Sequence, residues 1–183
     1  ILLRNFADME TSDGSRKKDY VFYFGRYSEE KGIRTLLKAC RNLPEIPFVF
    51  AGSGDLENLV NTAPNVENVG FLSGEALSRK IAEARFTIFP SECYENCPFS
   101  VMESVLNATP VIGTNAGGVP ELIEEGKTGE LFQAGDDKEL TQKVKALWQD
   151  WERCEKYAEN CKTVHFDTLE EYCEKLCGLY KGE

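Results

Sequence analysis

The chain has 183 residues, 42% of them hydrophobic and 28% charged, and it carries a net charge of −10. This length suits one domain with a sizeable core, and no apolar run approaches the roughly 20 residues of a membrane-spanning helix. The negative charge disfavours nucleic acid and anionic lipid surfaces as partners.

Short apolar runs alternate with segments of helical periodicity along most of the chain. Apolar runs between turn residues predict buried strands, at residues 20–24, 47–52, 65–71, 86–89, 109–114 and 128–132. Helical spacing or a favourable first residue predicts helices between them, at residues 31–43, 55–60, 74–84, 98–106 and 119–126. Two later stripes predict core-facing helices: Leu140, Val144, Leu147 and Trp151, then Leu169, Tyr172, Cys173, Leu176, Cys177 and Tyr180.

The alternation of strands and helices implies βαβ units and a parallel sheet. Right-handed crossovers then give an α/β fold, a doubly wound Rossmann-like domain. In such sheets ligands bind beyond the carboxyl ends of the strands. That rule selects five strand-to-helix junctions, which follow Phe24, Ala51, Phe71, Phe89 and Gly113.

The first junction reads GRYSEEKG, from Gly25 to Gly32. Arg26 and Lys31 flank a turn that opens a helix, and two cations beside helix amides suit an anion, a diphosphate above all. The alternative is a surface Arg and Lys around a helix capped at Ser28.

Glycines mark the second and fifth junctions. Gly52 and Gly54 in AGSGD allow a backbone to come close to a ligand, but the third glycine of the dinucleotide fingerprint is missing. Gly117 and Gly118 precede a helix in the same way. For both junctions plain turn chemistry is the alternative.

The fourth junction, PSECYENCPFSVMESV, carries Glu95 before a helix and Glu103 inside it, and Pro98 suits the first helical turn. If all the steps between the glutamates were helical, they would lie about 12 Å apart along the axis. A retaining glycosidase pair needs about 5 Å, which disfavours joint action on one atom. The two acids could instead grip two parts of one long ligand, with phosphates at the helix amides between them.

The seven cysteines are odd in number and stand in a chain large enough for a core. They therefore argue against a disulfide framework and for a reducing compartment, the cytoplasm. Cys173 and Cys177 stand one helical turn apart without a second ligand pair, and His165 is the single histidine. We accordingly expect no structural zinc site.

The motifs GRYSEEKG, AGSGD, GFLSG, FPSECYEN…FSVMES, TPVIGTNAGGVPELI and GKTGELF occur in one order. That order resembles the C-terminal, donor-binding domain of glycosyltransferase family 4, retaining enzymes of the GT-B architecture, over roughly residues 20–147. The opening ILLRNFAD lacks Met and a signal peptide and resembles the end of an interdomain connection. We therefore expect a fragment without its N-terminal acceptor domain: a connection at 1–15, a nucleotide-sugar-binding domain at 16–150 and C-terminal helices at 151–183.

The resemblance implies roles for individual residues. Arg26 and Lys31 would bind the diphosphate of the donor, Glu95 the hydroxyls of its sugar, and Glu103 the ribose. Arg26, Lys31 and Glu95 would carry the catalysis. The expected donor-binding set is Gly25, Arg26, Lys31, Gly52, Gly54, Phe71, Leu72, Glu95, Asn96, Cys97, Phe99, Ser100 and Glu103.

One departure from the family pattern stands out. Family members usually read Glu-Gly-Phe-Gly-Leu where this chain has Glu95-Asn96-Cys97-Pro98-Phe99. Pro98 removes an amide that could face phosphate, and Asn96 and Cys97 narrow the loop around the sugar. We expect a different donor choice or phosphate geometry, and we interpret Cys97 as a packing residue because no histidine stands near it.

The resemblance implies transfer of a sugar from a UDP- or GDP-sugar with retention, without a metal, in the cytoplasm or at the inner face of a membrane. The fragment alone is expected to bind donor and to turn over poorly or not at all. A nucleotide-sugar epimerase or a phosphorylase would need acid–base or cofactor residues that these junctions do not offer. A non-catalytic nucleotide-sensing or interaction module on the same scaffold is the remaining alternative.

Overall fold

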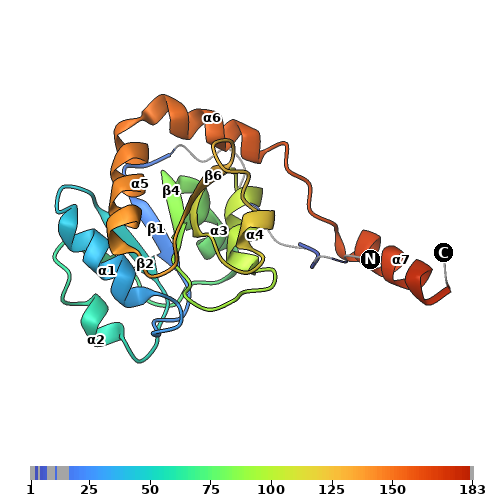
Figure 1. Ribbon diagram of the computed structural model, residues 1–183, viewed down its shortest axis with the longest axis horizontal. Coiled ribbons are helices and arrows are strands. Elements are labelled where there is room, and N and C mark those ends of the chain that lie inside the picture. Colours follow the sequence, from blue (N-terminus) through green and yellow to red (C-terminus); the bar gives the residue numbers. More distant parts are fainter. Residues whose placement is uncertain (1–2, 4, 8–10, 12–16, 182–183) are drawn as a thin grey trace.

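A computed structural model describes residues 3, 5–7, 11 and 17–181 of the chain (Figure 1). Its centre is a parallel six-stranded sheet of order β3-β2-β1-β4-β5-β6. The strands are β1 Val21–Phe24, β2 Phe48–Ala51, β3 Val66–Asn68, β4 Phe86–Phe89, β5 Val111–Thr114 and β6 Gly129–Phe132. The order reverses between β1 and β4, so the predicted doubly wound Rossmann-like fold is confirmed.

Helices cover both faces of the sheet (Figure 1). They are α1 Ile33–Asn42, α2 Glu57–Val60, α3 Gly74–Glu83, α4 Phe99–Leu106, the 3₁₀ turn η1 Val119–Glu121, α5 Asp137–Gln149, α6 Trp151–Cys161 and α7 Leu169–Lys181. Alternate residues of β1 serve the two faces, as strand geometry requires: Val21 and Tyr23 pack in the core of α1 and α5, and Phe22 packs on the side of α3. None of the helices among the described residues is long and apolar enough to cross a membrane.

The first predicted helical stripe is confirmed at Leu140, Val144 and Leu147, which lie in the main core, and it is wrong at Trp151. The second predicted stripe is wrong. Asp150 interrupts the first, because its carboxylate accepts from Arg153 N at 2.9 Å and thereby caps α6. Trp151 therefore begins a new helix and is half-exposed. The second stripe forms α7, which buries no residue and projects from the body (Figure 1). Its aromatic contact is with Phe6, whose ring centroid lies 5.3 Å from that of Tyr172.

Several boundaries also differ from the prediction. The segment predicted as a helix over 119–126 forms only the three-residue turn η1. The helix expected from Lys31 begins at Ile33, because Gly32 takes a left-handed φ of 67° there. Pro98 is the N-cap of α4 rather than part of its first turn, and Ser28 does not cap α1.

A buried carboxylate joins β6 to α5 and α6. Glu130 accepts from Tyr157 OH at 2.7 Å and from Lys143 Nζ at 3.0 Å, and it also pairs with Arg153. Burial by itself would raise the pKa of Glu130, but the bonds from Tyr157 and Lys143 and the two positive charges lower it. Since Cys154 and Tyr157 also enter the main core, α6 packs on the sheet.

Candidate functional site

Three cavities lie along the carboxyl edge of the sheet, where the five junctions meet. The loop cavity, of about 400 Å³, is lined by Glu95, Asn96, Cys97, Gly117 and Gly118, among others. The middle cavity, of about 210 Å³, is lined by Gly25, Lys31, Ser91, Ser100 and Glu103, among others. The outer cavity, of about 290 Å³, is lined by Gly25, Arg26, Gly52, Phe71 and Leu72, among others. Gly25 lines both the middle and the outer cavity, so these two adjoin each other.

Glu95 and Lys31 form an ion pair that joins the loop cavity to the middle cavity. Glu95 Oε1 also accepts from Ser91 Oγ at 3.0 Å and from Cys93 Sγ at 3.4 Å. Partial burial would raise the pKa of Glu95, but the bonds from Lys31 and Ser91 and the charge of Lys31 lower it. The sequence predicted these two residues separately; the structure brings them into direct contact.

Glu103 sits in a different electrostatic setting. It lies one turn into α4, is partly buried and lines the middle cavity beside Lys31. Within the described part of the chain its carboxylate has no hydrogen bond or ion pair, and burial raises its pKa. An oriented, desolvated carboxylate without a partner is suited to accept hydrogen bonds from a ligand's hydroxyl groups.

The start of α4 supplies donors to the same cavity. No side chain caps this helix, and the backbone N–H groups of Phe99 and Ser100 have no acceptor among the described residues. Free amides at a helix N-terminus, with the helix dipole behind them, form an anion site. Of these two residues Ser100 lines the middle cavity together with Lys31, so its amide and a cation share that cavity.

Arg26 lies at the outer cavity with a largely exposed side chain, 72% accessible. Its one ion pair within the described residues is a 3.9 Å contact from Nη1 to Glu30 Oε1. Tyr23 OH donates to the carbonyl of Arg26 at 2.9 Å, which fixes the backbone while the guanidinium stays available. The Arg26 side chain therefore lies exposed to solvent at the outer cavity, whereas Lys31 lines the middle cavity and is paired with Glu95.

The glycines of the second junction pack against the first junction. A Cβ on Gly52 would lie 1.9 Å from the carbonyl oxygen of Gly25, and one on Gly54 would lie 2.5 Å from that of Tyr27. The absence of side chains at these glycines therefore lets the two loops pack together. This packing is a reason for glycine at these positions in addition to the predicted approach to a ligand. Gly54 does not line any of the three cavities.

The glycines of the fifth junction brace the loop that carries Glu95. A Cβ on Gly117 would lie 2.3 Å from the carbonyl oxygen of Glu95, and one on Gly118 would lie 1.7 Å from that of Asn96. Gly118 N–H donates to the carbonyl of Glu95 at 2.7 Å. Gly32 packs in the same way against the start of this loop, because a Cβ on Gly32 would lie 1.9 Å from the carbonyl oxygen of Pro90.

Phe71, Phe99 and Cys97 complete the predicted set. Phe71 lines the outer cavity with a side chain that is 75% exposed. Phe99 is half-exposed at the start of α4 and lies outside the three cavities. Cys97 packs against α4, with its sulfur 3.7 Å from Met102 Sδ, and it also lines the loop cavity. Sequence reasoning missed Ser91 and Cys93, although both stand in the same loop as Glu95.

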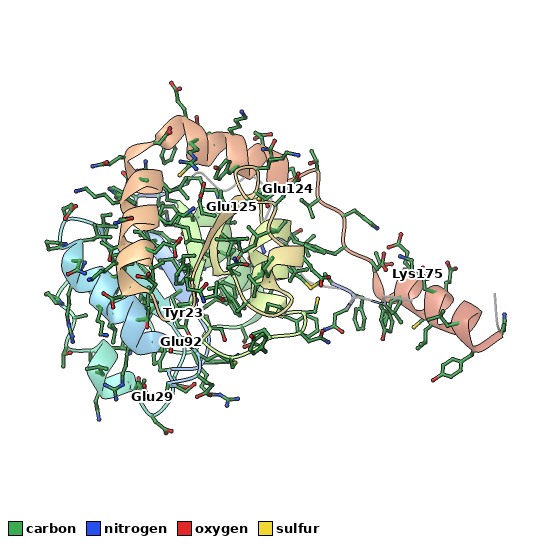
Figure 2. All side chains as sticks on the ribbon, in the orientation of Figure 1. Tyr23, Glu29, Glu92, Glu124, Glu125 and Lys175 are labelled. Carbon is green, nitrogen blue, oxygen red and sulfur yellow. The ribbon has the colours of Figure 1, made fainter. Side chains whose placement is uncertain are left out.

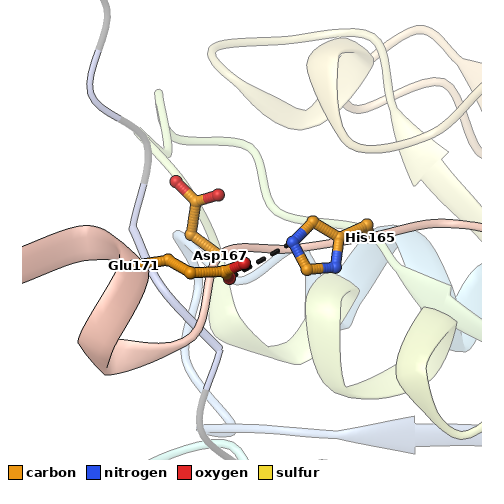
Figure 3. A group of neighbouring side chains, drawn as sticks. All are labelled: His165, Asp167 and Glu171. Carbon is orange, nitrogen blue, oxygen red and sulfur yellow. Dashed lines mark ion pairs between the residues drawn. The ribbon is translucent and has the colours of Figure 1, made fainter. Parts of the chain in front are cut away.

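Figure 3 shows the group of side chains in the described residues that could hold a metal ion, His165, Asp167 and Glu171. His165 Nε2 lies 3.2 Å from Glu171 Oε2, and Asp167 accepts from Lys175 Nζ at 2.6 Å. The ammonium group of Lys175 already supplies the charge that a metal would bring. The group lies in the segment leading into α7, apart from the junctions, and we assign no metal to it.

The chain matches the family model described as "Glycosyl transferases group 1" over residues 7–164. It is 36% identical to sulfoquinovosyl transferase SQD2 of Arabidopsis thaliana, over 77% of this chain and 29% of that protein. It is 31% identical to the GDP-mannose-dependent alpha-mannosyltransferase of Corynebacterium glutamicum, over 97% of this chain and 43% of that one. The chain thus spans less than half the length of these relatives.

The fold has solved counterparts as well. The structure of Anabaena Alr3699/HepE in complex with UDP superposes with a TM-score of 0.79 over 90% of this chain and 49% of that chain, at 22% identity. This structural similarity shows the fold, and the match of the family model to residues 7–164 shows the family membership. The chain belongs to the glycosyl transferases group 1 family.

Proposed function

We propose that the chain is the nucleotide-sugar-binding half of a glycosyltransferase that transfers a sugar from a UDP- or GDP-sugar with retention of configuration. The observation that carries the proposal is the middle cavity, where the partnerless Glu103, the ammonium of Lys31 and the free amides of α4 converge. Hydroxyl-accepting and anion-binding groups side by side match a ribose attached to a diphosphate.

The leaving group would be stabilised by groups already in place. As the sugar–phosphate bond breaks, negative charge develops on the diphosphate, and Lys31, Arg26 and the α4 amides are the donors at hand. In this scheme no metal is required. Lys31 is paired with Glu95 in the ligand-free chain, so a bound diphosphate would share Lys31 and leave Glu95 oxygens for the hydroxyls of the sugar.

The choice of base stays open between two candidates. The name of the Corynebacterium relative specifies GDP-mannose, and the Anabaena structure was solved with UDP. Phe71, exposed in the outer cavity, offers an aromatic face on which either base could stack. The acceptor would bind to a second domain outside this chain. We further propose residues 16–150 as the binding unit, residues 1–15 as a connection to that domain, and a cytoplasmic location.

Calorimetry with UMP, UDP, GMP and GDP tests the proposal. One diphosphate should bind at least about tenfold more tightly than its monophosphate, because charge-assisted hydrogen bonds to a second phosphate contribute about 1.5–3 kcal/mol. Lys31→Met should remove most of that difference. Lys38→Met, a lysine on the exposed face of α1 that pairs with Asp137, is the matched control and should bind like the wild type. Equal affinity for mono- and diphosphates would refute the assignment.

A further inference from the structure

A fourth cavity, of about 630 Å³, lies at the opposite edge of the sheet. Arg85 directly precedes β4, and Ala108 lies just before β5, so these lining residues stand at the amino ends of strands, with α6 closing the space. Figure 2 shows the two edges, with Glu92 after β4 at one and Glu124 before β6 at the other, near α6. We call this space the amino-edge cavity; it shares no residue with the three cavities of the carboxyl edge.

Arg85 is the most unusual residue of the amino-edge cavity. The residue is only 9% exposed, and its guanidinium lies between the rings of Trp148 and Trp151, 4.5 and 4.7 Å from their centroids. Its ion pair within the described residues is a 3.6 Å contact with the exposed Asp19. Nε is buried without an acceptor there. Buried guanidinium groups normally bind a carboxylate or phosphate through two parallel bonds, and this one lacks such a partner.

Lys17 adds a second cation to the wall of the same cavity. Its Nζ donates to Thr109 Oγ1 at 2.6 Å, and it forms no ion pair within the described residues. Burial lowers its pKa to about 8, because a charged ammonium is poorly solvated there. An ammonium in this position gains from any anion that enters, as the guanidinium does.

The rest of the wall limits what that anion can be. Ala82, Leu106, Ala158 and the ring of Trp151 make an apolar surface. Glu155, Glu159 and Lys162 lie on the α6 side, and Lys162 pairs with Glu159. Glu155, which has no ion pair within the described residues, repels a second negative group there. The fit is therefore to a molecule with one oxyanion head and an apolar body, in contrast to a nucleoside diphosphate.

We propose that the amino-edge cavity is a second binding site, for a small organic molecule that carries a single phosphate or carboxylate group. Its head would be bound by Arg85 and Lys17, and its body would lie on the apolar wall beside Trp151. The site would be separate from the middle cavity, so both could be occupied together.

Tryptophan fluorescence gives a direct test, because the two tryptophans of the chain are the two that flank Arg85. The probes are phenyl phosphate and benzoate, with benzyl alcohol as the uncharged analogue of similar size. The titration is done with saturating UDP or GDP present. We expect a saturable emission change with at least one anionic probe and none with benzyl alcohol.

Variants identify the groups involved. Lys17→Met and Arg85→Gln should each weaken the binding of the anionic probe at least about tenfold, as loss of a charge-assisted bond predicts. Lys18→Met is the matched control: this neighbouring lysine is exposed, pairs with Glu83 and is absent from the cavity wall. Circular dichroism checks that each variant folds. If Arg85→Gln does not fold, the affinity of Lys17→Met for the anionic probe tests the proposal by itself.

Four results would overturn the proposal. They are no saturable response to either anion at millimolar concentration, an equal response to benzyl alcohol, wild-type affinity in Lys17→Met, and displacement of the probe by the nucleotide. The last result would place the probe at the carboxyl edge instead.

Discussion

Gly118→Ala probes the brace that holds the Glu95 loop. The added Cβ would lie 1.7 Å from the carbonyl oxygen of Asn96, whereas real Cβ contacts essentially never fall below 3.0 Å. The loop must therefore retreat by more than an ångström, which stretches the 2.7 Å bond from Gly118 N–H to the carbonyl of Glu95. Overpacking costs about 1–3 kcal/mol and a lost hydrogen bond about 1 kcal/mol, so we expect the free energy of unfolding to fall by roughly 2–4 kcal/mol.

Urea unfolding measures that loss, and Gly126→Ala is the control. A Cβ on Gly126 would meet nothing within 4 Å, although its φ is +77°, so it should lose only the backbone strain of about 1–2 kcal/mol. Calorimetry adds a second readout. Gly118→Ala should weaken the binding of UDP-glucose or GDP-glucose more than that of the free diphosphate, because Glu95 moves while α4 does not. If Gly118→Ala is no more destabilising than Gly126→Ala and binds both ligands like the wild type, the brace is not what positions Glu95.

Three further predictions follow from the charges and caps of the fold. The pKa of Glu103 is raised in the free chain and should drop when hydroxyl groups bind the carboxylate. Nucleotide affinity should therefore fall as the pH is lowered through that raised pKa, a dependence that calorimetry should not find in Glu103→Gln. Glu130→Gln should destabilise the chain by about 3–5 kcal/mol in urea, because it breaks a buried ion network. Because the pKa of Glu130 is lowered in the fold, its contribution to the free energy of unfolding is fully present above the ordinary glutamate pKa and is lost as the pH falls through the lowered value. If Glu130→Gln lowers the free energy of unfolding by less than about 1 kcal/mol, the network contributes no more than an exposed surface pair. Asp150→Ala should cost about 1 kcal/mol of unfolding free energy by removing the cap of α6, and an unchanged urea midpoint would contradict the capping role.

The strands and most helices were predictable because each depends on local periodicity. The four residues of β1 are apolar throughout, as a strand covered on both faces must be. Periodicity does not say what an apolar stripe packs against, and that is why the stripe from Leu169 to Tyr180 was misread as core. The break at Asp150 did carry a local signal, an acid three residues before the N–H that it caps, but the continuing apolar spacing concealed it.

The location of the cavities was predictable from the sequence, whereas the contacts between their residues were not. The rule that ligands bind at the carboxyl ends of strands selected the junctions that line the three cavities. The pairing of Lys31 with Glu95 joins residues far apart in the chain, and no local pattern encodes it. The packing of Gly118 against the Glu95 loop is likewise not encoded by a local pattern. Why that position must be a glycine becomes clear only when the atom that occupies the place of a side chain is known.

The central claim is that a nucleoside diphosphate binds where α4 begins, between Lys31 and Glu103. Amide chemical-shift mapping with UDP and GDP tests it most directly. The account predicts the largest shifts at Phe99, Ser100 and Gly25, saturating with one affinity, and smaller shifts around Arg85. Shifts centred elsewhere, or none with either nucleotide at millimolar concentration, would contradict it.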